Sequence, residues 1–485
     1  MLKIYNETNY IRLVSRSSED IKKIRRHFTY KVVKWKNKRK IEYEKCLLVR
    51  NKYLLKGLLD ELLDFLKSNK INYKIQKILL EKNTISDETI KKFLKKLKLK
   101  FQPRFYQINA IKSVIENKMN TILSKTGSGK SFIAYLMTMF YVMMKKNKKI
   151  LIVVPSIQLV NQLYYDYEDY ASSNEKLDIK KYIKRLSGKT KNKTIDKEKI
   201  IIANWQYLQH LPKSFFEQFG LLIFDEAHGG KAYKAQKIIK NCVNCDFKMG
   251  LTGTLPEDDQ LKFKTVEGLL GKTIFSATSK ELIELGFISD LKIYTSIINH
   301  GCIENEGYKE EINYILNSDK RNSFLLKLFN KMNGNTLVLF KTTEKPFQYG
   351  RMLYNISKKT NKEIMYIDGN VDEEERNRIQ YEMEKKSNCI LFASYGTLAV
   401  GVSIKRINNV IFAESMKSEI KVLQSIGRGL RLHDSKEFVK IFDIVDKFEY
   451  NSRYHENGYL YDHWLKRKEY YDNEEFNYKV KEFIL

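Results

Sequence analysis

Short continuous apolar runs alternate with longer amphipathic stretches over most of this 485-residue chain. A continuous apolar run is typical of a strand buried on both faces, and helical stretches between such strands indicate a parallel sheet. The alternation begins near residue 120 and returns after about residue 280, so we predict two α/β units in tandem. The predicted strands cover residues 121–123, 150–155, 199–204, 221–224 and 248–254, then 335–340, 364–367, 389–394 and 409–413.

The first hundred residues follow a different pattern, with extended stretches and helices mixed. Strands are predicted at residues 10–14, 31–36 and 46–50. Helices are predicted where apolar side chains recur every three or four positions, at residues 18–28, 54–66 and 86–97, with Ser18 and Ser86 as caps. We therefore expect a small α+β domain at the start of the chain.

These patterns divide the chain into four parts. We expect the α+β domain over residues 1–100, the first α/β unit over 101–280 and the second over 281–447. Residues 448–485 are rich in Tyr, Asn and charge, and they predict a helical tail that packs on the second unit.

The net charge of +30 is unevenly distributed, because residues 1–100 hold 28 Lys and Arg against 11 Asp and Glu. A concentrated positive charge suits a polyanion such as nucleic acid, although a lysine-rich solvated surface is the alternative. The longest apolar run, residues 132–144, is shorter than the roughly 20 residues that cross a bilayer. With no signal peptide visible, we expect a cytoplasmic protein with no membrane contact.

Candidate chemistry begins directly after the first predicted strand of the α/β region. A glycine-containing turn there leads into a long helix, and free backbone N–H groups at such a helix start bind phosphate. Lys130 is expected to reach the β- and γ-phosphates of a nucleotide, and the Ser131 hydroxyl to ligate Mg²⁺. Ser124 stands where the strict pattern has Gly. The predicted cradle consists of Thr126, Gly127, Ser128, Gly129, Lys130 and Ser131.

Two carboxylates follow the apolar strand at 221–224. At the carboxyl end of a parallel strand they lie where open α/β sheets bind ligands. We expect Asp225 to hold Mg²⁺ and Glu226 to orient and deprotonate the attacking water. The strand at 248–254 ends in the hydroxyls of Thr252 and Thr254, which, with His228, are predicted to couple the carboxylates to the γ-phosphate.

Two further features concern nucleotide recognition. Tyr106 and Gln107 precede the phosphate turn by about twenty residues, where the amide of Gln107 can read an adenine edge and an aromatic ring can stack on the base. In the second unit, Arg428 and Arg431 are three residues apart and share one helical face. Two guanidinium groups can meet a γ-phosphate across a cleft, although a surface arginine pair is the alternative.

Together these pieces resemble a superfamily-2 helicase over about residues 101–446. The matching elements are Tyr106-Gln107, the phosphate turn, Val154-Pro155-Ser156, Asn204-Trp205-Gln206, Asp225-Glu226-Ala227-His228, Leu251-Thr252-Gly253-Thr254, Gly401 and residues 424–431. The chain is further similar to the UvsW recombination helicases of tailed bacteriophages, through residues 393–396, 424–433, 443–446 and 476–478. That family has a small DNA-binding domain before the motor.

The resemblance implies two RecA-like lobes that use ATP and Mg²⁺ to move along DNA. It implies branch migration of Holliday junctions, fork regression and unwinding of D-loops or R-loops. The expected partners are therefore branched DNA and RNA–DNA hybrids. We also expect the protein to be monomeric without DNA. Gln424, Arg428 and Arg431 would complete catalysis from the second lobe, and Gly401 would contact the nucleotide. If each lobe grips a nucleic-acid backbone, the expected contacts are Pro155, Ser156, Trp205, Tyr395 and Gly396.

Three alternatives remain open at this point. The motor could act on RNA or release transcripts, because the lobes alone do not separate DNA from RNA. It could translocate on duplex DNA without separating strands, although no nuclease constellation accompanies it. The non-enzymatic alternative is a nucleic-acid-binding scaffold with an inactive ATP site, against which the intact Lys130, Glu226 and arginine pair stand.

Overall fold

The computed structural model divides into two compact units, Met1–Ser124 with Gly129–Ser276, and Lys125–Ser128 with Ala277–Leu485. The structure describes residues 1–36, 39–125, 127–145, 147–174, 177–188, 190, 195, 197–231, 233–254, 259–303, 306–343, 348–399, 404–418, 422, 425–427, 433, 436–450 and 456–485. None of the helices among these residues combines the length and the apolar character needed to cross a bilayer.

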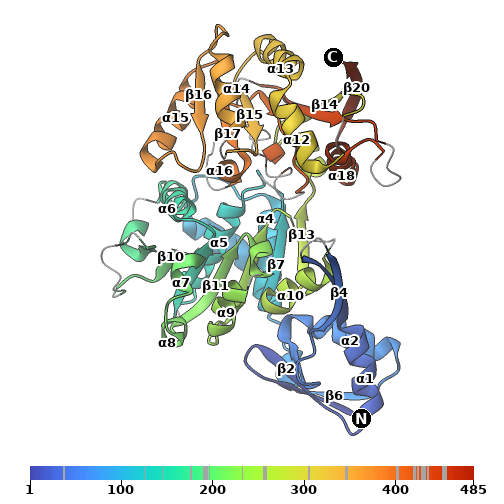
Figure 1. Ribbon diagram of the computed structural model, residues 1–485. Coiled ribbons are helices and arrows are strands. Elements are labelled where there is room, and N and C mark those ends of the chain that lie inside the picture. The colour runs from blue at the N-terminus through green and yellow to red at the C-terminus, as the bar shows by residue number, and fades with distance from the viewer. Residues whose placement is uncertain are drawn as a thin grey trace. The chain divides into compact units, whose positions relative to one another are not determined.

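The chain begins with a sheet of four short strands in the order β5-β2-β1-β6 (Figure 1). Alternate residues of β1 and β2 are buried against the apolar faces of two helices. Strands β3 and β4 form a separate antiparallel ribbon. The elements are β1 (Leu2–Asn6), β2 (Tyr10–Val14), α1 (Ser18–His27), β3 (Thr29–Lys36), β4 (Arg39–Cys46), β5 (Tyr53–Leu55), the 3₁₀ turn η1 (Lys56–Leu58), α2 (Leu59–Ser68), β6 (Tyr73–Ile75) and the turn η2 (Lys77–Leu79).

Several local predictions for this region were wrong in detail. The helix predicted from Leu54 begins at Leu59, because Leu54 and Leu55 lie in β5 and pair with β2. The cap of α1 is Ser17, whose hydroxyl accepts the N–H of Asp20 at 3.2 Å, and Ser18 is the first helical residue. The strand predicted at 46–50 does not form, since β4 ends at Cys46.

The helix α3 (Asp87–Leu97) begins after its predicted cap, Ser86, whose side chain accepts the N–H of Thr89. Its buried residues Ile90, Phe93 and Leu97 belong to the core of the large sheet that follows. The last helix within residues 1–100 therefore packs with the α/β part of the first unit.

That part is a seven-stranded sheet in the order β13-β7-β12-β11-β8-β10-β9, with helices on both faces (Figure 1). All pairings from β7 across to β9 are parallel. Successive side chains of a central strand enter different cores, as strands buried on both faces require. Ile150 and Ile152 pack with α4, α5 and α6, whereas Leu151 and Val153 pack with α9 and α10.

The predicted strands of this sheet are confirmed, and β9 and β13 are additional. The strands are β7 (Met119–Ser124), β8 (Lys149–Val154), β9 (Ile183–Leu186), β10 (Ile200–Asn204), β11 (Phe219–Asp225), β12 (Phe247–Thr252) and β13 (Thr273–Ala277). The helices are α4 (Phe105–Asn117), α5 (Lys130–Met143), α6 (Ile157–Ala171), α7 (Trp205–Leu208), α8 (Lys213–Phe216), α9 (Tyr233–Asn241) and α10 (Gln260–Leu270), with the 3₁₀ turns η3 (Ile179–Tyr182) and η4 (Ala227–Lys231).

The small N-terminal sheet is attached to α10 by a close backbone contact. A side chain at Gly57 would place its Cβ 2.0 Å from the carbonyl oxygen of Glu267, and one at Gly268 would meet Leu55 at 2.7 Å. Glycine at both positions therefore lets η1 and α10 touch. Lys264 of α10 adds an ion pair across this contact, to Glu61 of α2 at 2.8 Å.

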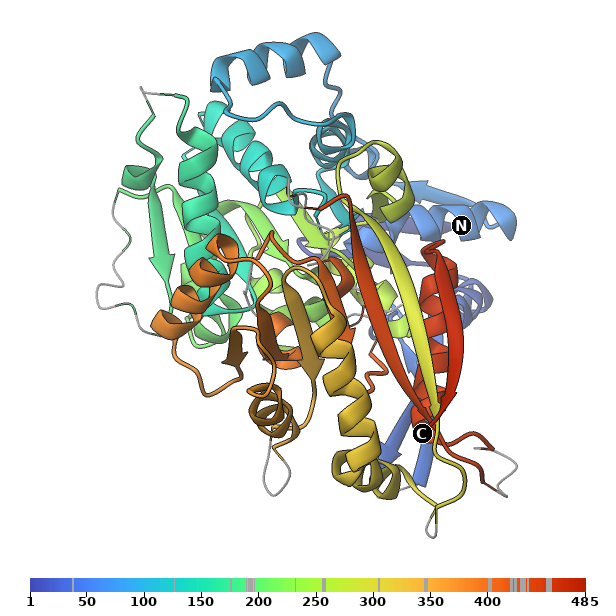
Figure 2. The same ribbon diagram turned by 90° about the horizontal axis from the view of Figure 1, so that it is seen from above.

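The second unit contains another seven-stranded parallel sheet, in the order β16-β17-β15-β18-β19-β14-β20. Figure 2 shows β14 in yellow between β19 and β20 in red. The strands are β14 (Asp290–Asn299), β15 (Thr336–Phe340), β16 (Ile364–Ile367), β17 (Ile390–Ser394), β18 (Asn409–Phe412), β19 (Phe438–Lys447) and β20 (Tyr478–Ile484). The helices are α11 (Ser279–Glu284), α12 (Tyr308–Asn317), α13 (Asp319–Lys331), α14 (Tyr349–Ser357), α15 (Glu373–Lys385), α16 (Tyr395–Ala399) and α18 (Tyr459–Asn473).

The prediction of a purely helical tail was wrong. After α18 the chain forms β20, which pairs with β14 over its full length. Four consecutive residues of β20 are exposed, so the strand lacks the apolar pattern by which it could be predicted. The four strands predicted for this sheet, β15 to β18, are confirmed.

Strand β19 carries two fully buried carboxylates, Asp443 and Asp446. Residues three apart on a strand point to opposite faces, so the two acids meet different helices. Asp443 pairs with Arg467 of α18 at 2.9 Å, and Asp446 pairs with Arg321 of α13 at 2.6 Å. The strand thereby fixes one helix on each of its faces.

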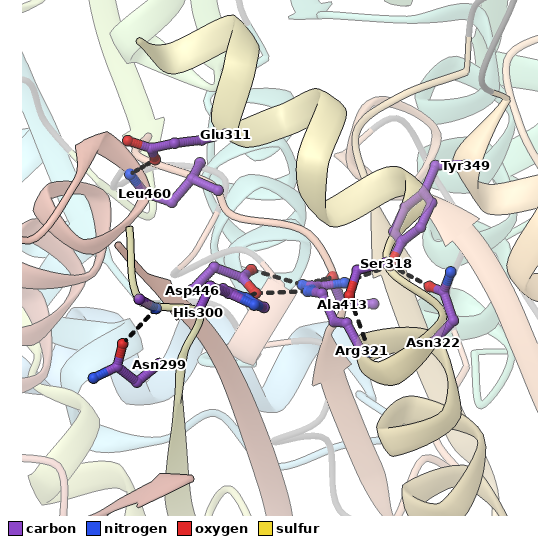
Figure 3. Close-up of polar contacts among 11 residues, drawn as sticks. Asn299, His300, Glu311, Ser318, Arg321, Asn322, Tyr349, Ala413, Asp446 and Leu460 are labelled. Carbon is purple, nitrogen blue, oxygen red and sulfur yellow. Dashed lines mark hydrogen bonds and ion pairs between the residues drawn. The ribbon is translucent and has the colours of Figure 1, made fainter. Parts of the chain in front are cut away.

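Arg321 and Asp446 are fully buried, and Figure 3 shows the guanidinium of Arg321 directed at the carboxylate of Asp446. Its guanidinium donates to both oxygens of Asp446, at 2.6 and 2.8 Å, and to the carbonyl of Ala413 at 2.9 Å. His300 lies 2.8 Å from the same carboxylate. Burial by itself raises the pKa of Asp446, but Arg321 and His300 outweigh it and hold that pKa at about 2.

Asp446→Asn is expected to lower the free energy of unfolding of the second unit by roughly 3 kcal/mol at neutral pH, because Arg321 keeps its buried charge without a counter-charge. The unfolded carboxyl takes a proton near its ordinary pKa of 3.8, whereas the folded one stays ionised down to about 2. The stabilisation is therefore present above pH 4 and is lost as the pH falls through 2. Urea unfolding at several pH values measures it.

Glu482→Gln is the matched control. Glu482 pairs with Lys447 at 3.2 Å on the exposed edge of the same sheet, so its loss should change stability by less than about 0.5 kcal/mol. An Asp446→Asn penalty that is as large at pH 2 as at pH 7 would contradict the account.

Candidate nucleotide site

The predicted site residues of the first sheet come together at one edge. Strands β7, β12, β11, β8 and β10 are consecutive neighbours and parallel, so their carboxyl ends lie side by side. The segments that follow them are, in that spatial order, residues 125–131, 252–254, 225–228, 155–156 and 205. Segments far apart in sequence thus form one continuous row, as ligand sites of open α/β sheets require.

The turn after β7 depends on two glycines in the left-handed region. Gly127 has φ +88° and Gly129 has φ +85°, and Gly129 is the N-cap of α5. A Cβ at Gly129 would also lie 2.6 Å from Nε2 of Gln107. Only glycine satisfies both the backbone angle and the close approach there. The N–H of Ser128 donates to the carbonyl of Lys125 at 3.1 Å and closes the turn.

The side chains that follow are held close to the loop. Nζ of Lys130 donates to the carbonyl of Ser124 at 3.2 Å, so the ammonium lies over the turn. The hydroxyl of Ser131 lies 2.7 Å from that of Tyr170. With Tyr170 as the donor, the Ser131 oxygen keeps a lone pair with which to bind a cation. The residues present therefore fit a nucleotide with Mg²⁺, since they supply an ammonium, a hydroxyl and a helix N-terminus.

Asp225 ends β11 beside these groups, and its carboxylate accepts the N–H of Glu226 at 3.0 Å. Burial and the charge of Glu226 raise the pKa of Asp225 to about 7, and the charge of Lys130 opposes that rise. Two acids crowded at one strand end favour a cation between them. Glu226 has φ +53°, an uncommon conformation for a residue with a side chain, and such conformations concentrate at functional sites.

A hydrogen-bond chain connects the ends of β11 and β12. Nδ1 of His228 lies 3.2 Å from a carboxylate oxygen of Glu226 and 3.1 Å from the hydroxyl of Thr252. That hydroxyl donates its one proton to the carbonyl of Thr254 at 2.6 Å. It can therefore only accept from His228, and the proton of the imidazole is on Nδ1. The three residues predicted to couple the carboxylates to the γ-phosphate thus lie in one hydrogen-bonded chain, and its histidine lies beside Glu226.

The first turn of α4 differs from the prediction in one residue. Oε1 of Gln107 accepts the N–H of Arg104 at 2.9 Å, which leaves its amide nitrogen beside Gly129. Tyr106, expected to stack on the base, has a ring that is 1% exposed and a hydroxyl bonded to Arg104 at 2.9 Å. The exposed aromatic is Phe105, at 59%. The sequence pattern does not distinguish the two aromatics, because which one is buried depends on which face of α4 packs into the core.

Of the expected nucleic-acid contacts, three lie at neighbouring strand ends in the first unit. Ser156 caps α6 by accepting the N–H of Leu159, and the carbonyl of Pro155 accepts the amide of Gln206 at 2.8 Å. Trp205 is half-buried at the start of α7. In the second unit Tyr395 is 2% exposed and donates to the carbonyl of Glu414 at 3.0 Å, so its side chain is a core residue, whereas Gly396 is exposed.

Five predicted residues lie outside the described part of the chain and stay predictions. They are Thr126, Gly401, Gln424, Arg428 and Arg431.

One buried acid of the second unit was not predicted. Glu414, directly after β18, accepts the N–H groups of Lys341 and Thr342 at 2.8 Å each and the Thr342 hydroxyl at 2.6 Å. It ties the ends of β15 and β18 together. The signal available in sequence was a lone carboxylate following an apolar strand, the same signal that identified Asp225.

Two family models match the chain in order. Residues 100–257 match the family described as type III restriction enzyme, res subunit, and residues 320–433 match the helicase conserved C-terminal domain. With the two parallel sheets and the row of strand ends, these matches define the class. The chain belongs to the superfamily-2 helicases and is an ATP-dependent enzyme of that class.

Individual relatives agree with this assignment. The chain is 29% identical to the ATP-dependent DNA helicase UvsW of Enterobacteria phage T4 over 457 residues, which are 90% of this chain and 89% of that protein. The crystal structure of T4 UvsW aligns with 100% of this chain and 99% of its own, with a TM-score of 0.50 and 26% identity. The fold of S. cerevisiae Dbp5 bound to RNA and ADP BeF3 covers 82% of this chain and 94% of its own, with a TM-score of 0.55 at 14% identity. The predicted fold, two RecA-like lobes after a small N-terminal sheet, is confirmed.

Thr252→Val keeps the size of the side chain but removes both the acceptor for His228 and the donor to Thr254. We expect ATP hydrolysis to stay within about threefold of normal, while strand displacement per ATP falls roughly tenfold, the size of an ordinary coupling free energy. Parallel ATPase and strand-displacement assays measure the two. Thr138→Val, which removes a buried hydroxyl of α5 that is bonded to Tyr167 of α6, is the control. Loss of both activities in equal proportion would argue against a coupling role.

Proposed function

We propose that this helicase uses ATP and Mg²⁺ to move along DNA and acts on branched DNA, by migrating Holliday junctions, regressing forks and unwinding D-loops or R-loops. The observation that carries the motor is the row of five parallel strand ends, which presents phosphate-binding and acidic groups beside the expected nucleic-acid contacts. The similarity over nine-tenths of the chain to a phage DNA helicase supports DNA as the track. We expect the protein to act in the cytoplasm, that of the host if the source is viral, and to be monomeric without DNA.

In the proposed cycle, Lys130 neutralises the β- and γ-phosphates, Ser131 and Asp225 hold Mg²⁺, and Glu226 takes a proton from the attacking water. The amide of Gln107 reads the base, and Phe105 is the candidate for stacking on it. Gly401, Gln424, Arg428 and Arg431 complete the site from the second lobe. The arginines gain a partner only while the γ-phosphate is present, so hydrolysis releases the closed state.

The N-terminal region supplies the proposed contact with a duplex. The β3–β4 ribbon is antiparallel and basic, and it exposes Val33, Ile41 and Tyr43 at 38–48%. A two-stranded ribbon fits the major groove of DNA, and exposed lysines such as Lys31 can meet phosphates beside it. Branched DNA offers both a duplex for this ribbon and a strand for the motor to track. A single strand offers no duplex.

The direct test is conversion of a synthetic four-way junction, run beside a forked duplex, a single strand and an RNA strand. We expect ATP-dependent conversion of the junction and the strongest ATPase stimulation by branched DNA. Lys130→Ala should lower DNA-stimulated ATP hydrolysis by roughly a hundredfold or more, because the developing phosphate charge loses its main counter-charge.

The outcomes separate the alternatives. Preferential stimulation by RNA would indicate an RNA helicase or transcript-release ATPase. Stimulation by duplex DNA without any separated product would indicate a translocase that leaves strands paired. Normal hydrolysis by Lys130→Ala would contradict the motor itself.

A further inference from the structure

A cavity of about 500 Å³ lies between the small N-terminal sheet and the large sheet of the first unit. It is at the opposite edge of the large sheet from the phosphate turn, because its walls include Lys118, just before β7, and Lys248, at the start of β12. Strand β7 spans about 20 Å from that edge to Ser124. The cavity is therefore separate from the candidate nucleotide site.

Lysines from three parts of the chain converge on this cavity. Lys56 comes from η1 of the N-terminal sheet, Lys118 from the end of α4, and Lys248 from β12, with Lys272 and Lys82 also in the lining. Among the described residues no carboxylate pairs with Lys56 or Lys118. Burial, then the charges of Lys248 and Lys118, lower the pKa of Lys56. Holding these lysine ammonium groups close together therefore costs electrostatic free energy when no anion lies between them.

The acids in the lining do not cancel this charge. Asp246 is already engaged, by the Tyr141 hydroxyl at 2.8 Å and by Lys148 at 3.5 Å. Asp60 and Glu81 are exposed to solvent. Lys248 is held in place by the side chain of Asn9 at 2.8 Å and the carbonyl of Ile239 at 3.3 Å, so its ammonium is positioned before any ligand arrives.

The lining also includes the apolar side chains of Leu59, Ile78, Leu79, Met119 and Ile274. A volume of about 500 Å³ exceeds what a lone phosphate fills and lies within the range of small-molecule sites. A ligand that offers an oxyanion to the lysines and a flat apolar part to these apolar side chains matches both kinds of lining residue. A nucleotide has that construction.

We propose that this cavity binds a nucleotide unit, with its phosphate among Lys56, Lys118 and Lys248. The phosphate oxygens relieve the repulsion between the ammonium groups and accept several charge-assisted hydrogen bonds at once. The unit is either a free nucleotide or one residue of a bound DNA strand. The second source rests on the proposed DNA-binding function, and the first does not.

The test uses the full chain with Lys130→Ala, which removes the main phosphate contact of the ATP site. Thymidine 5′-monophosphate is titrated by calorimetry, and DNA binding is measured at several salt concentrations. Lys56→Gln/Lys118→Gln is compared with Lys95→Gln/Lys96→Gln, a matched pair on the exposed face of α3. The first pair relieves repulsion, so its unfolding midpoint should equal or exceed that of the control. Lys118→Gln alone serves if the double variant does not fold.

A tenfold or larger loss of thymidine monophosphate affinity in the cavity variant alone, with unchanged DNA binding, identifies a free nucleotide. A fall in the salt slope of DNA binding by roughly 0.7 to 0.9, which is one phosphate contact, identifies a DNA strand. The proposal is overturned if the cavity variant and the control variant have the same monophosphate affinity and the same salt slope. Loss of junction conversion with both of these quantities unchanged would concern the proposed function and not this cavity.

Discussion

The parallel pairing of β7, β12, β11, β8 and β10 is the constraint on which the candidate site depends. It places five carboxyl ends at one edge, so that a loop, an acid pair, a threonine pair and the three expected nucleic-acid contacts are neighbours, although up to 129 residues (125 to 254) separate them. The glycines of the loop and the positive φ of Glu226 are local consequences, because backbone must turn sharply at each strand end to present its polar groups. The chain His228–Thr252–Thr254 then joins two of those ends by hydrogen bonds.

The second unit uses buried charge in a different way. Asp443 and Asp446 are both paired with arginine and enclosed, which costs desolvation and is tolerated only because each carboxylate has all its partners. Asp225, in contrast, lies at a strand end beside a second acid and has a raised pKa. The first arrangement fixes helices on a strand, and the second leaves an acid pair in need of a cation. Buried carboxylates alone therefore do not mark a site; their pairing distinguishes the two cases.

The central strands and the phosphate turn could be predicted from sequence because apolar runs and glycine spacing are local signals. The misses have physical causes. Leu54 and Leu55 extend the apolar pattern of the helix that follows, but they form strand β5 because they pair with β2. Strand β20 is an exposed edge strand whose residues carry no apolar pattern. Which of Phe105 and Tyr106 is buried depends on the packing of α4, and the burial of Tyr395 depends on its bond to Glu414. The lysine cavity joins residues 56, 118 and 248, so only the fold reveals it. The roles of the site residues, and those of the arginine pair outside the described chain, stay predictions.

The central claim is that one nucleotide is bound by the first lobe and hydrolysed only with the arginines of the second. Nucleotide affinity and DNA-stimulated ATP turnover of Arg428→Ala and Arg431→Ala, measured together in the full chain, test it most directly. The account predicts nearly unchanged affinity with turnover lowered by roughly a thousandfold, as for loss of an arginine finger. Arg378→Ala, on the exposed face of α15, should change neither quantity. Turnover at the normal rate in both arginine variants would contradict the claim.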